Sequence, residues 1–488
     1  MRLAELVERL GGGVLMGDAS VAVKGISHDS RRISRGDLFA ALPGRRTHGV
    51  DFLDQALARG AVAVLSSRQR PRGVTVPWIR SSRPRRLMAL AAWALAGDPQ
   101  RELLMVGITG TNGKSTAAHL TSLILAAAKI PSTFSGTLGC TLPSGASVPN
   151  ERTTPEATDL APLLRRSVAE GGRAAVTEVS SHALMEERLA GLEFQVAAWT
   201  NLSRDHLDYH GDMESYFLAK RRLFDEHLAP GGRRVLPVED PWGARLLDEV
   251  RPGDVAWGLG HGDVCAREVS GDLEGSRFTL AVGAASTPVR LPLVGIHNLR
   301  NALAAAATAH AAGARLSAIR AGLAAARPLP GRLERIPTGL PFPVFVDYAH
   351  TPDGLRTVLQ GLRRLTDRRL IVVFGAGGDR DTGKRGPMGF AVGELADVAV
   401  VTSDNPRSED PAKIATAVAE GVRAGGGEPA VILDRRSAIE RALEIADERS
   451  LVLVAGKGHE TTQTTGDRVV HFSDQEVIRE LAGGVPCG

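Results

Sequence analysis

The chain is poor in cysteine and lacks any apolar run long enough to cross a membrane. Its three cysteines, Cys140, Cys265 and Cys487, are far apart and odd in number. This pattern excludes a disulfide framework and a CxxC metal site. Two alanine-rich stretches, residues 87–96 and 302–312, are shorter than the roughly 20 residues of a membrane span, so we expect core helices there.

A secretion signal is also missing from the start of the sequence. The first residues, MRLAELVERLGGG, have the spacing of an amphipathic helix and carry Glu5 and Glu8, which a signal peptide would not. Together with the few cysteines, this predicts a cytoplasmic protein with no membrane partner.

Charge of one sign is not concentrated in any block. The 59 basic and 55 acidic residues leave a net charge of +4 that is spread along the chain. No stripe of basic and aromatic residues predicts a nucleic-acid partner, whereas small polyanionic substrates suit this balance. The chain is 43% hydrophobic and 23% charged, as in ordinary globular proteins. Nothing calls for an oligomer, so we expect a monomer.

At 488 residues the chain is too long for one hydrophobic core and predicts three α/β domains. The segments GDPQ (97–100) and PLPGRLERI (328–336) mark the boundaries, so we expect domains at residues 1–98, 99–331 and 332–488. Short strands and helices alternate in the first, and parallel-type strands follow in the second. The third has a regular βα alternation that predicts a Rossmann-like sheet, although its GAGGDRD segment only weakly approaches a dinucleotide fingerprint.

The second domain begins with LLMVGITGTNGKSTAAHLTSLIL, an apolar β-prone run, a glycine-rich turn and an alanine- and leucine-rich helix. Strand, loop and helix in this order form a phosphate-binding loop. Gly110 and Gly113 let backbone N–H groups surround an anion at the helix N-terminus. Lys114 is expected to reach the β- and γ-phosphates, and Ser115 to hold Mg²⁺.

This loop departs from the strict P-loop pattern at one position. The pattern requires glycine at position 108, where Ile108 stands, and Gly107 comes one place early. The alternative is an ordinary glycine turn before a helix. Because GKS falls at the right place between strand and helix, the pattern favours a site for ATP or GTP.

Further polar residues follow the strands of the second domain. Glu178 begins EVSSH at the end of one predicted strand, and His206 lies in NLSRDHLDYHG just past the next. Ligands of open α/β sheets bind at the carboxyl ends of strands, so both residues are candidates for Mg²⁺ near the γ-phosphate. The alternative is that Asp205 and His206 are loop or helix-capping residues. Lys220, on the next predicted helix, is by itself expected to be a surface lysine.

Other segments leave two interpretations open. Asn298 and Asn301 open a helix in HNLRNALAA, where helix capping is the usual role and adenine recognition the alternative. The polar loops at residues 28–37 and 43–49 suit a nucleotide or sugar phosphate, although solvated arginines are commoner in such loops. Residues 255–294 contain alternating runs that predict a small antiparallel hairpin insertion.

Polar signatures also recur at the strand ends of the third domain. They are DYAHTPDGL, GGDRDTGKRGPM, SDNPRSEDP and AGKGHE. Each alone is compatible with turn chemistry. Four on the carboxyl edge of one sheet favour a binding site that faces the P-loop domain.

Taken together, these segments resemble the Mur ligase family, the ATP-dependent amide-forming enzymes of peptidoglycan precursor synthesis. The resemblance rests on GTNGKS, TTPEAT, EVSSHAL, NLSRDHLDYHG with the AK that follows, HNLRNALAA, DYAHTPDGL, GGDRDTGKR, DNPRSEDP and AGKGHE. It is closest to the members that add a diamino acid to UDP-N-acetylmuramoyl-L-alanyl-D-glutamate. It implies a small uridine-nucleotide domain, a central P-loop ATPase-like domain and a C-terminal domain that binds the amino acid.

The resemblance also implies roles for the residues at matching positions. The implied catalytic residues are Lys114, Glu178, His206 and Lys220. The implied Mg²⁺ ligands are Ser115, Glu178, His206 and Lys220, the last as a carbamate formed with carbon dioxide. The implied ATP contacts are Gly110, Thr111, Asn112, Gly113, Lys114, Ser115, Thr116, Asn298, Arg332 and Asp347. The implied contacts of the UDP-muramoyl-dipeptide are Ser30, Thr153, Thr154, Ser180 and Arg188, with the loop from Arg45 to His48. The implied contacts of the amino acid are Arg380, Asp404, Asn405, Arg407, Gly456 and Glu460.

The implied chemistry is attack of the dipeptide carboxylate on ATP to give an acyl phosphate, which the amine of the amino acid then converts to an amide. Arg407 points to meso-diaminopimelate as that amino acid, because its fork suits a second carboxylate. L-Lysine or L-ornithine is the alternative if Arg407 is a solvated loop residue. A P-loop kinase and a nucleotide switch are more distant alternatives, and neither accounts for the polar strand ends of the third domain.

Overall fold

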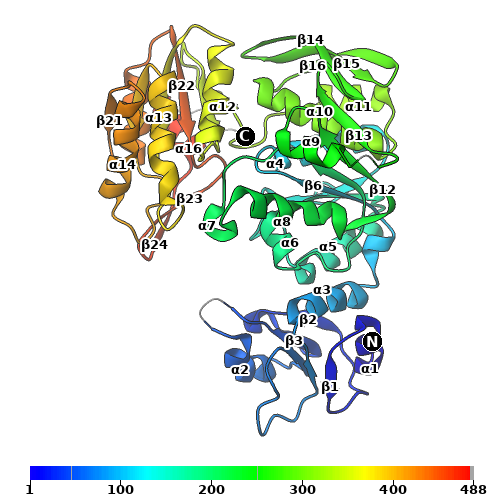
Figure 1. Ribbon diagram of the computed structural model, residues 1–488. Helices are drawn as coiled ribbons and strands as arrows, with labels where there is room; N and C mark the ends of the chain where they lie inside the picture. Colours follow the sequence, from blue (N-terminus) through cyan, green and yellow to red (C-terminus); the bar gives the residue numbers. More distant parts are fainter. Residues whose placement is uncertain (45–46, 250, 484–488) are drawn as a thin grey trace.

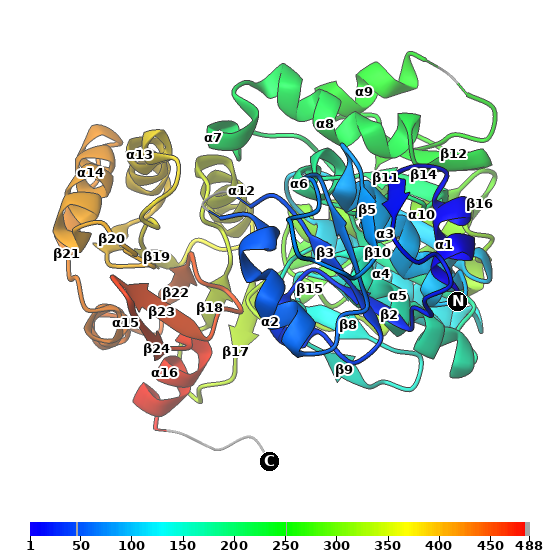
Figure 2. The same ribbon diagram turned by 90° about the horizontal axis from the view of Figure 1, so that it is seen from below.

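The computed structural model describes residues 1–44, 47–249 and 251–483. The described chain forms three α/β units, each built on its own sheet (Figure 1). The N-terminal unit, in blue, lies below the central unit, in cyan to green. The C-terminal unit, in yellow to red, lies beside the central one. Figure 2 shows the same arrangement from below, with the N-terminal unit in front of the central one.

The N-terminal sheet has the order β1-β5-β4-β3-β2, with β2 to β5 parallel and β1 antiparallel to β5. The elements of this unit are α1 (Leu3–Leu10), β1 (Val14–Met16), β2 (Gly25–Ser27), β3 (Asp37–Ala41), α2 (Leu53–Ala58), β4 (Ala63–Ser66), β5 (Trp78–Arg80) and α3 (Pro84–Leu95). The amphipathic helix predicted at the start is α1, and it buries Leu3, Leu6 and Leu10.

The central sheet has the order β16-β15-β14-β13-β12-β11-β6-β10-β7-β8-β9. Its strands are β6 (Leu104–Thr109), β7 (Ser132–Gly136), β8 (Gly139–Thr141), β9 (Ser147–Val148), β10 (Ala174–Glu178), β11 (Phe194–Trp199), β12 (Leu228–Pro237), β13 (Val255–Leu259), β14 (Val264–Asp272), β15 (Gly275–Val282) and β16 (Ala285–Leu291). Its helices are α4 (Lys114–Ala127), α5 (Ala157–Ala169), α6 (Ser181–Met185), α7 (Leu207–His210), α8 (Met213–Asp225), α9 (Pro241–Leu247), α10 (Ile296–Ala311) and α11 (Leu316–Ala324).

Helices cover both faces of the central sheet because its middle strands are apolar on both sides. Along β6, Val106 and Ile108 pack with α4, α10 and α11, whereas Met105 packs with α3, α5 and α8. The alanine-rich stretches expected to be core helices are α3 and α10. Of the helices in the described ranges, none is long and apolar enough to cross a membrane.

The antiparallel hairpin expected at residues 255–294 is not a separate insertion. Strands β14, β15 and β16 pair antiparallel, as predicted, but β13 pairs in parallel with both β12 and β14. The hairpins therefore extend the edge of the central sheet. Local alternation predicts a hairpin but carries no information about the strand on which it docks.

The C-terminal sheet has the order β17-β18-β22-β19-β20-β21, parallel except for β17. Its elements are β17 (Glu334–Ile336), β18 (Val344–Asp347), α12 (Pro352–Arg363), β19 (Arg369–Phe374), α13 (Arg385–Leu395), β20 (Val398–Val401), α14 (Pro411–Ala424), β21 (Pro429–Val431), α15 (Arg435–Glu444), β22 (Ser450–Ala455) and α16 (Asp474–Leu481). A separate hairpin, β23 (Thr462–Thr465) and β24 (Arg468–His471), follows β22. The alternation predicts this Rossmann-like sheet correctly.

The segment that joins the central and C-terminal units is tightly packed at Gly331. Its φ of 65° is left-handed, and a Cβ there would overlap the backbone of Gly458 and His459, in the loop after β22. Gly339, a few residues further on, also has a left-handed φ, 70°, but a Cβ there would meet nothing within 4 Å. The PLPGR segment therefore carries a close backbone approach in addition to a turn.

These two glycines give a matched test of that approach. Gly339→Ala should cost only the left-handed strain, about 1–2 kcal/mol. Gly331→Ala should cost roughly 1–3 kcal/mol more, because the loop after β22 must move. Urea unfolding followed by circular dichroism measures both. Equal losses would show that the close approach at Gly331 does not constrain the fold.

Candidate active site

The P-loop lies between β6 and α4. At two of its glycines, neighbouring residues leave no room for a side chain. Gly110 has φ 146° and Gly113 has φ 82°. A Cβ on Gly110 would overlap the Thr200 hydroxyl, and one on Gly113 would overlap the Asn301 amide. The loop is therefore packed between the end of β11 and the start of α10, with its N–H groups at the N-terminus of α4.

The departure from the strict P-loop has a structural explanation. Gly107, which comes one place early, lies within β6, where a Cβ would approach the Phe194 ring to 3.0 Å. That glycine serves strand packing rather than the phosphate loop. The phosphate-binding turn begins at Gly110, so an isoleucine at position 108 is compatible with it.

Two lysines meet at one carbonyl of this loop. Lys114 Nζ donates to the carbonyls of Gly110 (2.9 Å) and Thr111 (2.8 Å). Lys220 Nζ donates to the same Gly110 carbonyl at 2.8 Å and lies 4.6 Å from the centre of the Tyr216 ring. The expectation that Lys220 is a surface lysine is wrong, because its side chain is 1% exposed. It shares the inner face of α8 with Tyr216 and Phe224.

Burial and charge both act on these lysines. Burial moves the pKa of Lys220 well below its usual value, the nearby Lys114 lowers it further, and Asp205 opposes the shift. Burial also lowers the pKa of Lys114, against the attraction of Glu178 and Asp205. Two ammonium groups this close repel each other. The repulsion is relieved by a bound anion, or by a Lys220 side chain that does not carry a full positive charge.

Glu178 ends β10 beside the P-loop and is fully buried. Thr137 donates to it twice, from the backbone N–H at 2.9 Å and from Oγ1 at 3.2 Å. Its carboxylate and the buried Ser115 hydroxyl are the oxygen donors that Mg²⁺ prefers. Within the described ranges no three His, Cys, Asp or Glu side chains form a metal cage.

His206 lies at the N-cap position of α7 with a left-handed φ of 54°, but its side chain makes no capping bond. Its ring is instead 4.9 Å from that of His182, centre to centre, and 3.4 Å separates its Nε2 from Asp205 Oδ2. Burial lowers the pKa of His206 to about 4, so its imidazole ring is neutral at neutral pH. The capping interpretation therefore does not account for this histidine.

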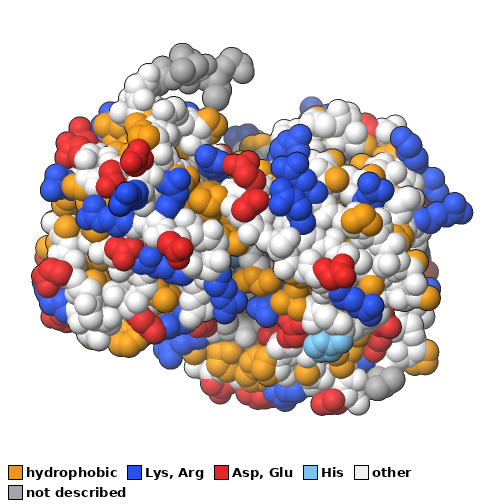
Figure 3. Space-filling model, turned by 90° about the horizontal axis from the view of Figure 1, so that it is seen from above, with side chains coloured by type: hydrophobic (Ala, Val, Ile, Leu, Met, Phe, Trp, Pro, Cys, Tyr) orange, Lys and Arg blue, Asp and Glu red, His pale blue; other side chains and the backbone are white. Residues whose placement is uncertain are grey.

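The loop that carries His206 also faces the C-terminal unit. Arg204 pairs with Asp381 at 3.8 Å across the boundary. Burial opposes the fall in the pKa of Asp205, but His206, then His350 and Lys384 of the C-terminal unit, lower it. Figure 3 shows basic and acidic side chains interspersed on the face seen from above, with no broad area of one sign. The polar ends of the two sheets thus meet through charges of both signs.

The residues expected to hold the dipeptide gather after β10 and before α5. Thr154 Oγ1 donates to the Glu178 carbonyl (2.8 Å) and to Ser180 Oγ (3.2 Å), and Thr137 Oγ1 donates to Thr153 Oγ1 (3.1 Å). Arg188 donates to the Thr154 carbonyl at 3.1 Å. The structure therefore brings Thr153, Thr154, Ser180 and Arg188 together with Glu178.

The residues expected at the uridine diphosphate belong to the N-terminal unit. Ser30 is buried and donates to Gln55 Oε1 at 2.6 Å. His48 Nε2 lies 3.2 Å from Ser67 Oγ. Arg45, at the start of the expected loop, lies outside the described residues. This unit is tied to the central one by α3, whose Arg85 pairs with the buried Glu156.

The three residues expected at the adenosine lie in two units. Asn298 is buried in α10 and donates to the Val294 carbonyl at 2.9 Å, while Gly295 takes the N-cap position. Arg332 stacks 4.6 Å from the centre of the Tyr348 ring. The Asp347 carboxylate accepts backbone N–H groups of Leu333 and Ala349, at 2.6 and 2.7 Å. Helix capping therefore does not explain Asn298, and Asp347 shapes the chain around Arg332.

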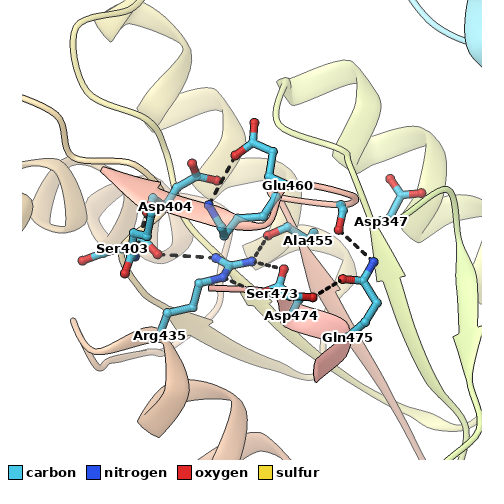
Figure 4. A network of polar contacts seen from close by, with 12 residues as sticks. Asp347, Ser403, Asp404, Arg435, Ala455, Glu460, Ser473, Asp474 and Gln475 are labelled. Atoms are coloured by element: carbon cyan, nitrogen blue, oxygen red, sulfur yellow. Dashed lines mark hydrogen bonds and ion pairs between the residues drawn. The ribbon is translucent and has the colours of Figure 1, made fainter. Parts of the chain in front are cut away.

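The strand ends of the C-terminal sheet form a compact polar cluster (Figure 4). Asn405 donates to Glu460 Oε2 at 2.8 Å and accepts from the Thr464 backbone at 3.0 Å. A Cβ on Gly456, which has φ 115°, would come within 2.7 Å of Asp404 Oδ2. Asp404, Asn405, Gly456 and Glu460 are therefore side by side, as the sequence predicts.

The two arginines expected in this site differ in their surroundings. Arg407 is half-buried with a left-handed φ of 54°, and its Nη1 donates to the Gly378 carbonyl at 2.5 Å. Its side chain is therefore held in part by the loop after β19. Arg380 is exposed, near Lys384 at the boundary with the central unit.

Sequence reasoning missed one side chain that shapes the site. Lys457 of AGKGHE is fully buried and donates to the Thr462 carbonyl (2.7 Å), with Asn405 Oδ1 and Glu460 Oε2 at 3.4 and 3.3 Å. Its position inside the AGKGHE motif was the available signal. Asn301, which the sequence does single out, packs against Gly113.

The similarity of this chain to known proteins covers all three units. Three family models match it: the Mur ligase family, catalytic domain, over residues 22–96, the Mur ligase middle domain over 108–309, and the Mur ligase, glutamate ligase domain over 331–458.

Similarity to individual proteins is equally extended. A UDP-N-acetylmuramoyl-L-alanyl-D-glutamate–2,6-diaminopimelate ligase of Solibacter usitatus is 42% identical over 96% of this chain and 94% of its own. The ligase of that name from Gloeobacter violaceus is 43% identical over 98% of both. A solved structure with the same name is 31% identical, with a TM-score of 0.67 and 99% of both chains covered. Since this similarity includes the P-loop and the polar strand ends of both larger sheets, the chain belongs to the Mur ligase family.

Proposed function

We propose that this protein is an ATP-dependent ligase that joins meso-2,6-diaminopimelate to UDP-N-acetylmuramoyl-L-alanyl-D-glutamate through an amide bond. The observation that carries the proposal is the pairing of a P-loop, flanked by Lys114, Lys220 and Glu178, with the polar strand ends of the C-terminal sheet. The relatives that match nearly the whole chain bear the name of this ligase. We place the reaction in the cytoplasm, with the protein acting as a monomer.

The three units have separate tasks in this proposal. Residues 1–98 bind the uridine diphosphate, residues 99–331 bind ATP and the dipeptide, and residues 332–488 bind the amino acid. Thr153, Thr154 and Arg188 hold the dipeptide beside Glu178, so its terminal carboxylate lies near the γ-phosphate. Asn298, Arg332 and Asp347 hold the adenosine between the two larger units.

The residues around the P-loop act by neutralising negative charge. The dipeptide carboxylate and the triphosphate are both anionic, so their approach is repulsive unless cations neutralise them. Lys114 and the P-loop N–H groups supply that neutralisation at the phosphates. The carboxylate attacks the γ-phosphate, ADP leaves, and an acyl phosphate forms. The amine then attacks the acyl carbon, and phosphate leaves.

Mg²⁺ fits beside Ser115, Glu178 and His206, and when bound it would withdraw charge from the phosphate oxygens as a Lewis acid. Lys220 is proposed to join this group as a carbamate. Burial favours its neutral amine, the form that reacts with carbon dioxide. A carbamate would relieve the repulsion from Lys114.

The C-terminal cluster is proposed to hold the amino acid by opposite charges. The Asp404 and Glu460 carboxylates face the amino groups, and Arg407 receives the distal carboxylate that distinguishes diaminopimelate from lysine and ornithine. Arg380, exposed at the boundary, is placed to contact the bound amino acid. Contact between the two larger units excludes water from the acyl phosphate.

The direct test incubates the protein with ATP, Mg²⁺, the UDP-linked dipeptide and one diamino acid at a time. We expect release of ADP and free phosphate that requires both the dipeptide and meso-diaminopimelate, with a UDP-tripeptide as product. A kinase would yield a phosphorylated product without free phosphate, and a nucleotide switch would release phosphate without any amine. Preferred turnover of L-lysine or L-ornithine would contradict the choice of amino acid alone.

Lys220→Ala tests the carbamate. The variant should lose most of its activity, and a short carboxylic acid such as acetate should restore part of it by occupying the vacated position. Lys413→Ala, at an exposed position on α14, is the control and should behave as wild type with and without acetate. An Lys220→Ala variant that stays fully active would remove Lys220 from the site.

Arg407→Ala tests the specificity residue. Loss of a bidentate charged pair should cost roughly 2–5 kcal/mol, seen as a steep rise in KM for diaminopimelate with little change in KM for ATP or dipeptide. Arg436→Ala, which breaks a surface pair with Glu480 on another face, is the control. A KM for diaminopimelate that is the same in both variants would separate Arg407 from the distal carboxylate.

A further inference from the structure

A buried ion pair lies directly beneath the polar strand ends of the C-terminal sheet. It joins Arg435, the first residue of α15, to Asp474, the first residue of α16. Arg435 Nε and Nη2 donate to the two carboxylate oxygens of Asp474, each at 2.7 Å, and both side chains are 0% exposed. The guanidinium lies between the labelled strand ends in Figure 4.

The remaining donors of Arg435 reach the backbone of two separate strand ends. Nη2 donates to the carbonyl of Ala455 at 3.0 Å, and Nη1 donates to that of Ser403 at 3.4 Å. Ala455 is the last residue of β22, and Ser403 follows β20, while β19 lies between these strands in the sheet. One planar group therefore bridges the carboxyl ends across three strands.

Each of these carbonyls directly precedes a residue of the proposed amino-acid site. Asp404 and Asn405 follow Ser403, and Gly456 follows Ala455. Because Gly456 leaves no room for a side chain against Asp404, a small shift of either strand end would change that contact. The guanidinium is thus bonded to the two points that set the spacing between Asp404 and Gly456.

Stability alone does not account for a charged pair in this place. Removing two charges from water is costly, and well-packed apolar residues often replace a buried pair without loss of stability. Burial lowers the pKa of Arg435, but the carboxylates of Asp474, Asp404 and Glu460 outweigh burial and raise it. The guanidinium therefore stays charged and keeps its bonds to the Asp474 carboxylate and the two strand-end carbonyls.

We propose that Arg435, oriented by Asp474, is a positioning residue that sets the spacing between the strand ends at Ser403–Asn405 and Ala455–Gly456 for binding of the amino acid. This inference rests on the proposed function, since it concerns the amino-acid substrate of that reaction. Lysine cannot replace Arg435 in this role, because a single ammonium lacks the planar fork that reaches a carboxylate and two separate carbonyls.

The chain offers a matched control for a buried arginine. Arg234, in β12 of the central unit, is also 0% exposed and donates to both carboxylate oxygens of Asp254, from Nε at 3.0 Å and from Nη2 at 2.5 Å. It bonds no strand end of the amino-acid site. Arg234→Lys therefore reports the effect of the same substitution on folding alone.

The test compares steady-state kinetics and thermal unfolding of the full-length wild type, Arg435→Lys and Arg234→Lys. Arg435→Lys should raise the KM for meso-diaminopimelate about tenfold, equivalent to about 1.4 kcal/mol, with KM for ATP and for the UDP-dipeptide within about twofold of wild type. Arg234→Lys should leave all three KM values unchanged, whatever its melting temperature.

A second variant keeps the test decisive if Arg435→Lys fails to fold. The double change Arg435→Met with Asp474→Leu removes both charges, so no buried charge is left unpaired. It should fold and show the same selective rise in KM for diaminopimelate.

Two results would overturn the inference, and they are distinguishable. If the wild type turns over diaminopimelate but the folded Arg435 variants keep its KM, or if KM for ATP rises equally, Arg435 has only a structural role. If the wild type releases no phosphate in response to diaminopimelate, the proposed function fails, and this inference fails with it.

Discussion

The close packing of the P-loop against β11 and α10 is the constraint on which the rest of the site depends. Gly110 and Gly113 have no room for a side chain, because Thr200 and Asn301 occupy the space on either side. The loop is therefore held by tertiary contacts in addition to its own turn. Lys114 and Lys220 both donate to the Gly110 carbonyl, so this packing fixes where the two side chains meet beside the phosphate loop.

The sequence predicts features that neighbouring residues determine better than features that depend on distant segments of the chain. The βα alternation of the third unit predicts its sheet, because continuous apolar runs are typical of buried parallel strands. The antiparallel pairing after β13 was also predicted, but the strand to which these hairpins attach was not, because pairing partners are set by distant strands. Residues 97–100, expected to mark a domain boundary, lie between α3 and β6 and include the buried Pro99 and Gln100.

The site residues show the same difference between local patterns, which the sequence reveals, and contacts between distant segments, which it does not. Motif positions identify Glu178, Thr154 and Asn405, and the structure brings their neighbours together as expected. Lys220 was misjudged as a surface residue, although Tyr216 and Phe224, four residues before and after it, mark the inner face of α8. Arg435 carries no motif of its own, and its importance follows only from the carbonyls that it reaches. Such contacts between distant segments cannot be deduced from one sequence.

Each of the two larger units carries charges of both signs near the proposed reaction. Lys114 and Glu178 lie beside the P-loop, whereas Arg407 lies with Asp404 and Glu460 at the strand ends of the C-terminal sheet. In the proposed reaction, Lys114 faces a polyanionic acyl phosphate, and the C-terminal charges face the amino and carboxylate groups of a zwitterionic amino acid. Bringing the two together without substrates would leave amines and carboxylates each partly desolvated and poorly paired, which costs free energy. In the proposed reaction, substrates bound between the two units would pair with these groups and offset that cost on both sides.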